Sequence, residues 1–207
     1  TTGAPKGCML SHGYYTYVPW SWFENDWYSP DDHLITAMPM FHIAAILPML
    51  ATFDVGGAYL TMGYFDAGQA LEMLEREKAT ATYPSFVTIM SDLIYHPNFK
   101  KTDLTRVKLM NSNFAVQPPG IKDAMLKAMP NAIQVGSFGM TECAGTVSTG
   151  KPSDTLESRV TRLGHPLPGL EVRVVDPDTG QDVPRGRRGE VYVRGYSTLQ
   201  GYYKDAE

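Results

Sequence analysis

The segment from Thr1 to Gly7 contains residue types that can bind a polyphosphate. It runs Thr-Thr-Gly-Ala-Pro-Lys-Gly. Glycine lets the backbone turn its N–H groups toward an anion, threonine hydroxyls add donors, and Lys6 adds positive charge. The segment is not a Walker loop, because there a Gly-Lys-Ser/Thr sequence precedes a helix, whereas here Lys6 comes before Gly7. Taken alone, the segment is equally consistent with a simple terminal turn.

A second candidate segment runs from Gly136 to Glu142 and follows a predicted strand. Its Phe138 offers a flat face for a purine ring, and its glycines allow close approach of the backbone. Thr141 can donate to a phosphate, and the carboxylate of Glu142 can bind Mg²⁺. Spacing alone leaves open an ordinary strand-to-helix turn with Glu142 on the surface.

The elements that must position these segments alternate between short apolar runs and amphipathic helices from Leu34 to Ser137, which predicts a parallel α/β sheet. Asp66 is the expected N-cap of one helix, with Gln69 at the capping-box position. The predicted helices span 43–53, 66–78, 87–94 and 121–128, and the predicted strands span 80–83, 106–110 and 132–135. Beyond about Leu163 two further strands are predicted at 171–175 and 190–194. Ligands of open parallel sheets gather at the carboxyl ends of strands, where Gly136 to Glu142 would lie.

Composition excludes several classes of protein. The 207 residues are 43% hydrophobic, which predicts a globular chain with a real core. The net charge of -4 argues against nucleic-acid binding. The most apolar run, Ile43 to Phe53, contains Pro48 and is far shorter than the roughly 20 residues of a transmembrane helix. Cys8 and Cys143 form no CxxC pair, which favours the cytoplasm.

Other chemistries lack their motifs. The sequence has no Gly-x-Ser-x-Gly elbow and no His-Glu-x-x-His pair. Cys143 is more simply a packed thiol than a nucleophile. The aromatic run from Tyr14 to Trp27 predicts core or inter-subdomain packing, with the wall of an acyl tunnel as the second interpretation.

Taken together and in order, several motifs resemble those of the adenylate-forming (AMP-binding) superfamily of acyl-CoA synthetases, peptide-synthetase adenylation domains and luciferases, and most resemble an acyl-CoA ligase. The motifs are Thr1 to Gly7 with Ser11 and His12, Pro39 to His42, Gly136 to Glu142, Gly164 to Gly169, Gly189 to Gly195, and Gly201-Tyr202-Tyr203.

The resemblance implies roles for particular residues. Lys6 would belong to a phosphate loop that closes on ATP, Phe138 would contact adenine, Thr141 would contact phosphate, and Glu142 would bind Mg²⁺. His42 would lie beside the acyl pocket. The implied catalytic residues are Lys6, His42, Thr141 and Glu142, and the implied nucleotide-binding residues are Thr1, Thr2, Gly3, Pro5, Lys6, Gly7, Gly136, Ser137, Phe138, Gly139, Met140 and Thr141.

We expect an α/β fold in three parts: residues 1–33 with the phosphate loop, an α/β AMP-binding subdomain at 34–162, and the start of a small β-barrel-like subdomain at 163–207. We expect an internal fragment, inactive alone, because the resemblance implies a preceding sheet, a ribose-binding Thr-Gly-Asp and a C-terminal domain with a catalytic lysine. One departure from the family pattern is Asn113-Phe114-Ala115, where a Gly-Gly-Ala-like turn is common.

The predicted activity is attack of a fatty, aromatic or alicyclic carboxylate on ATP, giving an acyl-AMP that is passed to coenzyme A. The expected co-substrates and cofactor are ATP, CoA and Mg²⁺. One alternative acceptor is the phosphopantetheine of a carrier protein. A non-catalytic nucleotide-binding module is an alternative from a different class.

Overall fold

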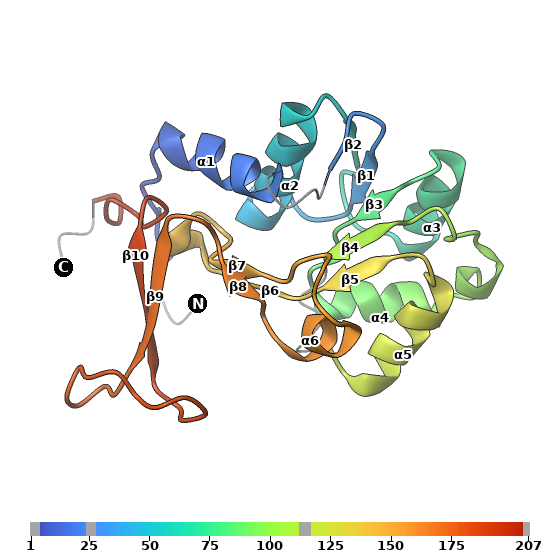
Figure 1. Ribbon diagram of the computed structural model, residues 1–207. Helices are drawn as coiled ribbons and strands as arrows, with labels where there is room; N and C mark the ends of the chain where they lie inside the picture. Colours follow the sequence, from blue (N-terminus) through green and yellow to red (C-terminus); the bar gives the residue numbers. More distant parts are fainter. Residues whose placement is uncertain (1–4, 24–27, 112–116, 205–207) are drawn as a thin grey trace.

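The computed structural model describes residues 5–23, 28–111 and 117–204, and its main body is a parallel sheet with helices on both faces (Figure 1). The sheet order is β2-β1-β3-β4-β5, with every pair parallel. Its strands are β1 (His33–Thr36), β2 (Ala58–Thr61), β3 (Ala81–Thr82), β4 (Leu109–Asn111) and β5 (Ile133–Val135). The flanking helices are α2 (Ile43–Asp54), α3 (Ala67–Arg76), α4 (Val87–Tyr95) and α5 (Pro119–Ala128), with a 3₁₀ turn η1 (Phe99–Lys101). The predicted α/β class is confirmed.

The strand order reverses direction at β1. From β1 the chain crosses through α2 to β2 on one side, and it then returns through α3 to β3 on the other side of β1. Right-handed crossovers in opposite directions put α2 on one face of the sheet and α3 to α5 on the other, as Figure 1 shows. The chain therefore leaves the carboxyl ends of the paired strands β1 and β3 toward opposite faces of the sheet, and an open sheet has its crevice at such a point.

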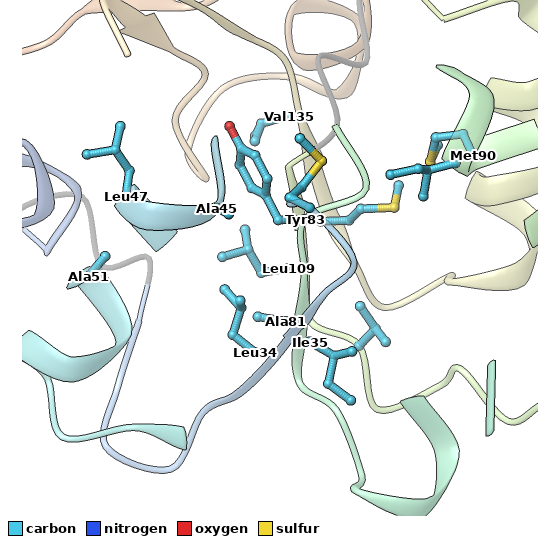
Figure 2. Packing of buried hydrophobic residues seen from close by; sticks show 14 of the residues in the cluster. Leu34, Ile35, Ala45, Leu47, Ala51, Ala81, Tyr83, Met90, Leu109 and Val135 are labelled. Carbon is cyan, nitrogen blue, oxygen red and sulfur yellow. The ribbon is translucent and has the colours of Figure 1, made fainter. Parts of the chain in front are cut away.

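The core fills both faces of this sheet. Figure 2 shows Leu34 of β1 on the same side of the sheet as Ala45 and Leu47 of α2, while Ile35 of β1 and Met90 of α4 lie on the other side. Alternate residues of a strand point to opposite faces, so Leu34 and Ile35 serve different helices. Both are at most 2% exposed, which explains why β1 is apolar without alternation.

The sequence predicted the start of α3 correctly but not the start of β4. The Asp66 carboxylate accepts a hydrogen bond from the Gln69 N–H at 2.8 Å, so the predicted cap of α3 is confirmed. The predicted strand at 106–110 was wrong at its start, since β4 begins at Leu109. Val107 instead closes a turn onto the Leu104 carbonyl.

A second, antiparallel sheet follows the first. It consists of β6 (Ser137–Phe138), β7 (Ser148–Thr149) and β8 (His165–Pro166), with a 3₁₀ turn η3 (Thr141–Cys143) in the β6–β7 loop and α6 (Leu156–Thr161) before β8. The alternative of an ordinary strand-to-helix turn for Gly136 to Glu142 does not hold, because Phe138 lies in strand β6 and its carbonyl accepts the Val147 N–H.

The third layer is a two-stranded antiparallel ribbon of β9 (Leu170–Val175) and β10 (Glu190–Gly195), which extends away from the parallel sheet (Figure 1). Both predicted strands are confirmed. The boundaries near residues 33 and 163 stay predictions, and the pairing of β7 with β8 runs across the second of them.

The helix α1 (His12–Phe23) carries part of the aromatic run and packs on α2. Tyr14 is buried, and its hydroxyl donates to the Thr198 carbonyl beyond β10. The Tyr17 ring lies 4.9 Å from that of Tyr196. These contacts join parts of the chain about 180 residues apart. Among the described residues, no helix has the length and apolar character needed to cross a bilayer.

Candidate active site

A cleft of about 930 Å³ opens at the carboxyl ends of β1, β3 and β5. This volume is at the upper end of the range of small-molecule sites. Its walls come from five places in the chain: residues 5–8, the start of α2 with His42, the end of β3 and the turn after it, β6 with the β6–β7 loop, and Tyr202. The cleft therefore lies at the reversal of strand order, as expected for an open parallel sheet.

One half of the cleft is mainly apolar and lies between the amino ends of α2 and α4. Ile43, Ala44 and Leu47 of α2 line one side, and Tyr83 and Phe86 line the other.

His42 also lines the cleft, and its ring lies edge-on to that of Phe86 at 5.4 Å between centroids. Its Nδ1 accepts the Ala44 N–H at 3.0 Å and so caps α2. Burial lowers the pKa of His42. The neutral ring then carries its proton on Nε2, because Nδ1 is used as an acceptor.

The other half of the cleft is formed by the tight loop between β6 and β7. The Gly145 N–H donates to the Met140 carbonyl at 2.9 Å, and Ala144 adopts a left-handed conformation with φ of 53°. A Cβ placed on Gly139 would lie 1.5 Å from the Gly145 carbonyl oxygen, so a residue larger than glycine cannot occupy this position without moving the backbone. The loop presents Phe138, Thr141 and Glu142 to the cleft.

A buried polar cluster holds the base of this loop. The Asn111 amide donates to the Ser137 hydroxyl at 2.7 Å, and the Ser137 hydroxyl lies 3.0 Å from that of Thr149. These three side chains are at most 5% exposed and tie the end of β4 to β6 and β7. Buried polar groups that are mutually satisfied specify one arrangement, so the parallel sheet and the loop are held in fixed relation.

Glu142 is held by a segment that comes much later in the chain. Its carboxylate Oε1 accepts the Tyr202 hydroxyl at 2.7 Å, and its carbonyl accepts the Leu199 N–H at 2.8 Å. The Tyr202 hydrogen bond, a backbone N–H and the charge of Lys6 lower the pKa of Glu142 against the opposing effect of burial. The group is therefore a carboxylate at neutral pH.

The same late segment positions Lys6. Residues 7–9 pair antiparallel with residues 200–203, through Tyr203 N–H to the Gly7 carbonyl at 2.7 Å and Met9 N–H to the Gly201 carbonyl at 3.0 Å. The Lys6 ammonium consequently lies 4.7 Å from the centre of the Tyr202 ring.

The chemistry of this end of the cleft suits a magnesium nucleotide. Among residues 5–23, 28–111 and 117–204, no three His, Cys, Asp or Glu side chains gather in a way that could hold a metal ion by themselves. Mg²⁺ commonly takes one or two carboxylates and completes its octahedron with phosphate oxygens and water. Glu142 fits that pattern, because it is ionised, lines the cleft and has Oε2 in addition to the oxygen bonded to Tyr202.

The structure brings together most of the residues predicted from sequence. Those that line the one cleft are Pro5, Lys6, His42, Ser137, Phe138, Gly139, Met140, Thr141 and Glu142. Gly7 and Gly136 do not line it; their carbonyls accept backbone N–H groups of Tyr203 and Gly150 instead. Thr1, Thr2 and Gly3 lie outside the described residues, as does Asn113-Phe114-Ala115.

Other lining residues were not predicted. Three of them, Tyr83, Ser85 and Phe86, directly follow β3. The order of the strands in the sheet would have pointed to this segment, but that order cannot be read from the sequence. Cys8 also lines the cleft, but burial and the charge of Glu142 raise the pKa of its thiol, so it is not a thiolate nucleophile. Tyr202 belongs to the Gly201-Tyr202-Tyr203 motif, but the sequence assigns it no role.

Comparison with known proteins agrees with the resemblance seen in the sequence motifs. The family model described as "AMP-binding enzyme" matches residues 1–203. The chain is 32% identical over 214 residues to 4-coumarate–CoA ligase 4 of Arabidopsis thaliana, a match that covers all of this chain and 37% of that protein.

Solved structures agree. The crystal structure of a long-chain-fatty-acid-CoA ligase (FadD1) from Archaeoglobus fulgidus superposes with a TM-score of 0.87 at 25% identity, covering 99% of this chain and 42% of that one. ATP-bound MatB from Rhodopseudomonas palustris superposes with a TM-score of 0.85 at 27% identity, covering 98% and 39%.

The fold is that of the large N-terminal domain of adenylate-forming enzymes, and the chain belongs to the AMP-binding enzyme family. The relatives it matches are acyl-CoA synthetases and 4-coumarate–CoA ligases, and the chain spans a little over a third of their length.

Proposed function

We propose that this chain forms the nucleotide and acid site of an ATP-dependent acyl-CoA ligase. The observation that carries the proposal is the meeting of Lys6 with Phe138, Thr141 and Glu142 around one cleft whose other half is apolar. A site for a polyphosphate and a site for an apolar acid are therefore adjacent. A carboxylate bound in the apolar half can be held close to the α-phosphorus of a nucleotide bound in the other half.

In this mechanism the substrate carboxylate oxygen attacks the α-phosphorus of ATP, and the bond to the bridging oxygen of pyrophosphate breaks. Lys6 and the Thr141 hydroxyl stabilise charge on the phosphates, and Phe138 offers its ring to the adenine. Mg²⁺ bound to Glu142 would neutralise further phosphate charge. No covalent bond to the protein is needed. The resulting acyl-AMP is then attacked by the thiol of CoA, which releases AMP.

The acid is proposed to be apolar, either fatty, aromatic or alicyclic. Ile43, Ala44 and Leu47 bury hydrocarbon well but offer no partner to a second charged group. An aromatic acid could also stack against Phe86, as His42 does at its edge. The two cysteines are unpaired, which accords with a cytoplasmic enzyme.

Acid-dependent exchange of labelled pyrophosphate into ATP tests the proposal on the full-length protein, with a panel of short, fatty, aromatic and alicyclic acids. We expect exchange with at least one apolar acid. Acid-dependent release of AMP with CoA, but not with a phosphopantetheine carrier, would separate the two acceptors. Absence of exchange with every acid, together with intact ATP binding, would leave the nucleotide-binding module.

Glu142→Ala is the first informative variant. We expect exchange to fall by roughly 10²–10³-fold, the usual loss when one preorganised electrostatic group is removed. Glu157→Ala is the matched control, because Glu157 is an exposed glutamate on α6 outside the cleft. Retained exchange in Glu142→Ala would remove Glu142 from the metal site.

A further inference from the structure

Residues 199–203 contact both halves of the phosphate end of the cleft. The Leu199 N–H and the Tyr202 hydroxyl bind Glu142, while the backbone from Gln200 to Tyr203 pairs with residues 7–9 beside Lys6. The two segments expected to enclose the nucleotide are therefore both held by this third segment.

Tyr202 is the side chain at the junction. Its hydroxyl donates to Glu142 Oε1 at 2.7 Å, and its ring faces the Lys6 ammonium at 4.7 Å. The residue is half-buried and lines the cleft. A tyrosine can make both contacts at once, because its hydroxyl lies in the ring plane while a cation approaches the ring face.

The hydrogen bond has a consequence for metal binding. A carboxylate has two oxygens, and a hydroxyl fixed to Oε1 orients the group so that Oε2 is presented in a single direction. Supporting hydrogen bonds of this kind orient metal ligands in many proteins, and their loss weakens metal binding about 10–100-fold. The backbone bond from Leu199 holds the main chain of Glu142 but cannot fix the rotation of its side chain.

We propose that Tyr202 is a positioning residue that orients the Glu142 carboxylate for the metal of the bound nucleotide and sets Lys6 beside it. The inference rests on the proposed function, since it needs a magnesium nucleotide in this cleft. Nothing in the sequence motif that contains Tyr202 indicates the partner, which is 60 residues away.

The test is Tyr202→Phe in the full-length protein, which keeps the ring and removes only the hydroxyl. ATP binding is measured by calorimetry twice, with Mg²⁺ and with excess EDTA. We expect affinity for MgATP to fall about tenfold, at the lower limit for loss of a supporting ligand. Affinity for metal-free ATP should change less than twofold, because the ring still faces Lys6.

Tyr203→Phe is the matched control. Its side chain is 63% exposed and does not line the cleft, so neither affinity should change.

A double-mutant cycle with Glu142→Gln removes the effects of any general loosening of the fold. When the carboxylate is absent, Tyr202→Phe should cause no further loss of MgATP affinity. Equal losses with and without Mg²⁺, or additive losses in the cycle, would overturn the positioning role.

If Tyr202→Phe proves unstable, Glu142→Asp tests the same contact, because it keeps the charge and withdraws it from the hydroxyl by one methylene. It should lose MgATP affinity selectively, and an unchanged ratio of the two affinities would contradict the inference. A wild-type protein that binds no ATP would instead defeat the proposed function.

Discussion

Asp32 joins the amino ends of the strands of the parallel sheet, at the edge opposite the cleft. Its side chain is fully buried and accepts hydrogen bonds from the Ser29 N–H at 2.7 Å, the Ser29 hydroxyl at 2.9 Å and the Thr80 hydroxyl. Lys108 adds an ion pair at 2.9 Å. Thr80 precedes β3 and Lys108 precedes β4, so one carboxylate ties the starts of β1, β3 and β4 together.

Asp32→Asn should destabilise the fold by about 2–4 kcal/mol without altering the cleft. Hydrogen bonds to a charged group contribute roughly 1.5–3 kcal/mol each. Asparagine retains one acceptor oxygen but turns an NH₂ group toward donors. Lys108 is 52% exposed, so its ion pair adds at most about 1 kcal/mol.

The pH dependence gives a second check. Burial alone would raise the pKa of Asp32, but hydrogen bonds from Thr80, Lys108 and Ser29 outweigh it and lower the pKa. The stabilisation is thus fully present above the unfolded-state value of about 3.9 and is lost as pH falls through the lower folded value.

Urea unfolding of the full-length protein from pH 7 down to about pH 3 measures both quantities, with exchange activity assayed at pH 7. The gap between wild type and Asp32→Asn should be constant from pH 7 to about pH 5 and should shrink below about pH 4. Asp31→Asn is the matched control, because Asp31 is exposed. A gap below about 1 kcal/mol at pH 7, or one that persists in acid, would refute the reasoning.

Two further substitutions probe the cleft itself. Gly139→Ala should reduce pyrophosphate exchange at least tenfold, because the added methyl group would overlap the Gly145 carbonyl. Gly120→Ala is the control and should be neutral, because there is open space around Gly120. Both variants are compared with wild type by exchange activity and by thermal unfolding. His42→Ala should raise the KM for the acid several-fold and leave the KM for MgATP unchanged, because His42 contacts Phe86 in the apolar half. The variant also loses the N-cap of α2, which should lower the free energy of unfolding in urea by about 1 kcal/mol. Equal effects on both KM values would argue against a place for His42 beside the acid.

Sequence patterns predicted the parts of the fold that local physics determines. The cap at Asp66 and the helices near residues 43, 87 and 121 follow from side-chain periodicity and from hydrogen bonds within a few residues. The strands β3 and β5 were also visible as short apolar runs, whereas β4 was predicted to start too early and the bounds of β1 and β2 were not predicted. The expectation that Gly136 to Glu142 lies at a strand's carboxyl end also held, because that position follows from the parallel sheet alone.

The antiparallel sheet of β6, β7 and β8 could not be predicted in this way. Its strands have two residues each, too few to show a period, and they are specified by Gly139 and by the buried Asn111, Ser137 and Thr149. The pairing of residues 7–9 with 200–203 joins nearly the two ends of the chain. No local pattern encodes such a contact, so the role of Tyr202 became apparent only in three dimensions.

These two kinds of structure divide the cleft. The apolar half rests on α2 and α4, whose ends are set by the parallel sheet, and the phosphate half rests on the β6–β7 loop and on residues 199–203. Asn111 and Ser137 join the two halves through a buried hydrogen bond. Although the halves are joined in this way, most of their supporting residues differ. On the proposed function, substitutions in the apolar half should therefore affect mainly the acid and those in the phosphate half mainly the nucleotide. His42 and Tyr202 lie on opposite sides of that division, which is why their variants should separate the two affinities.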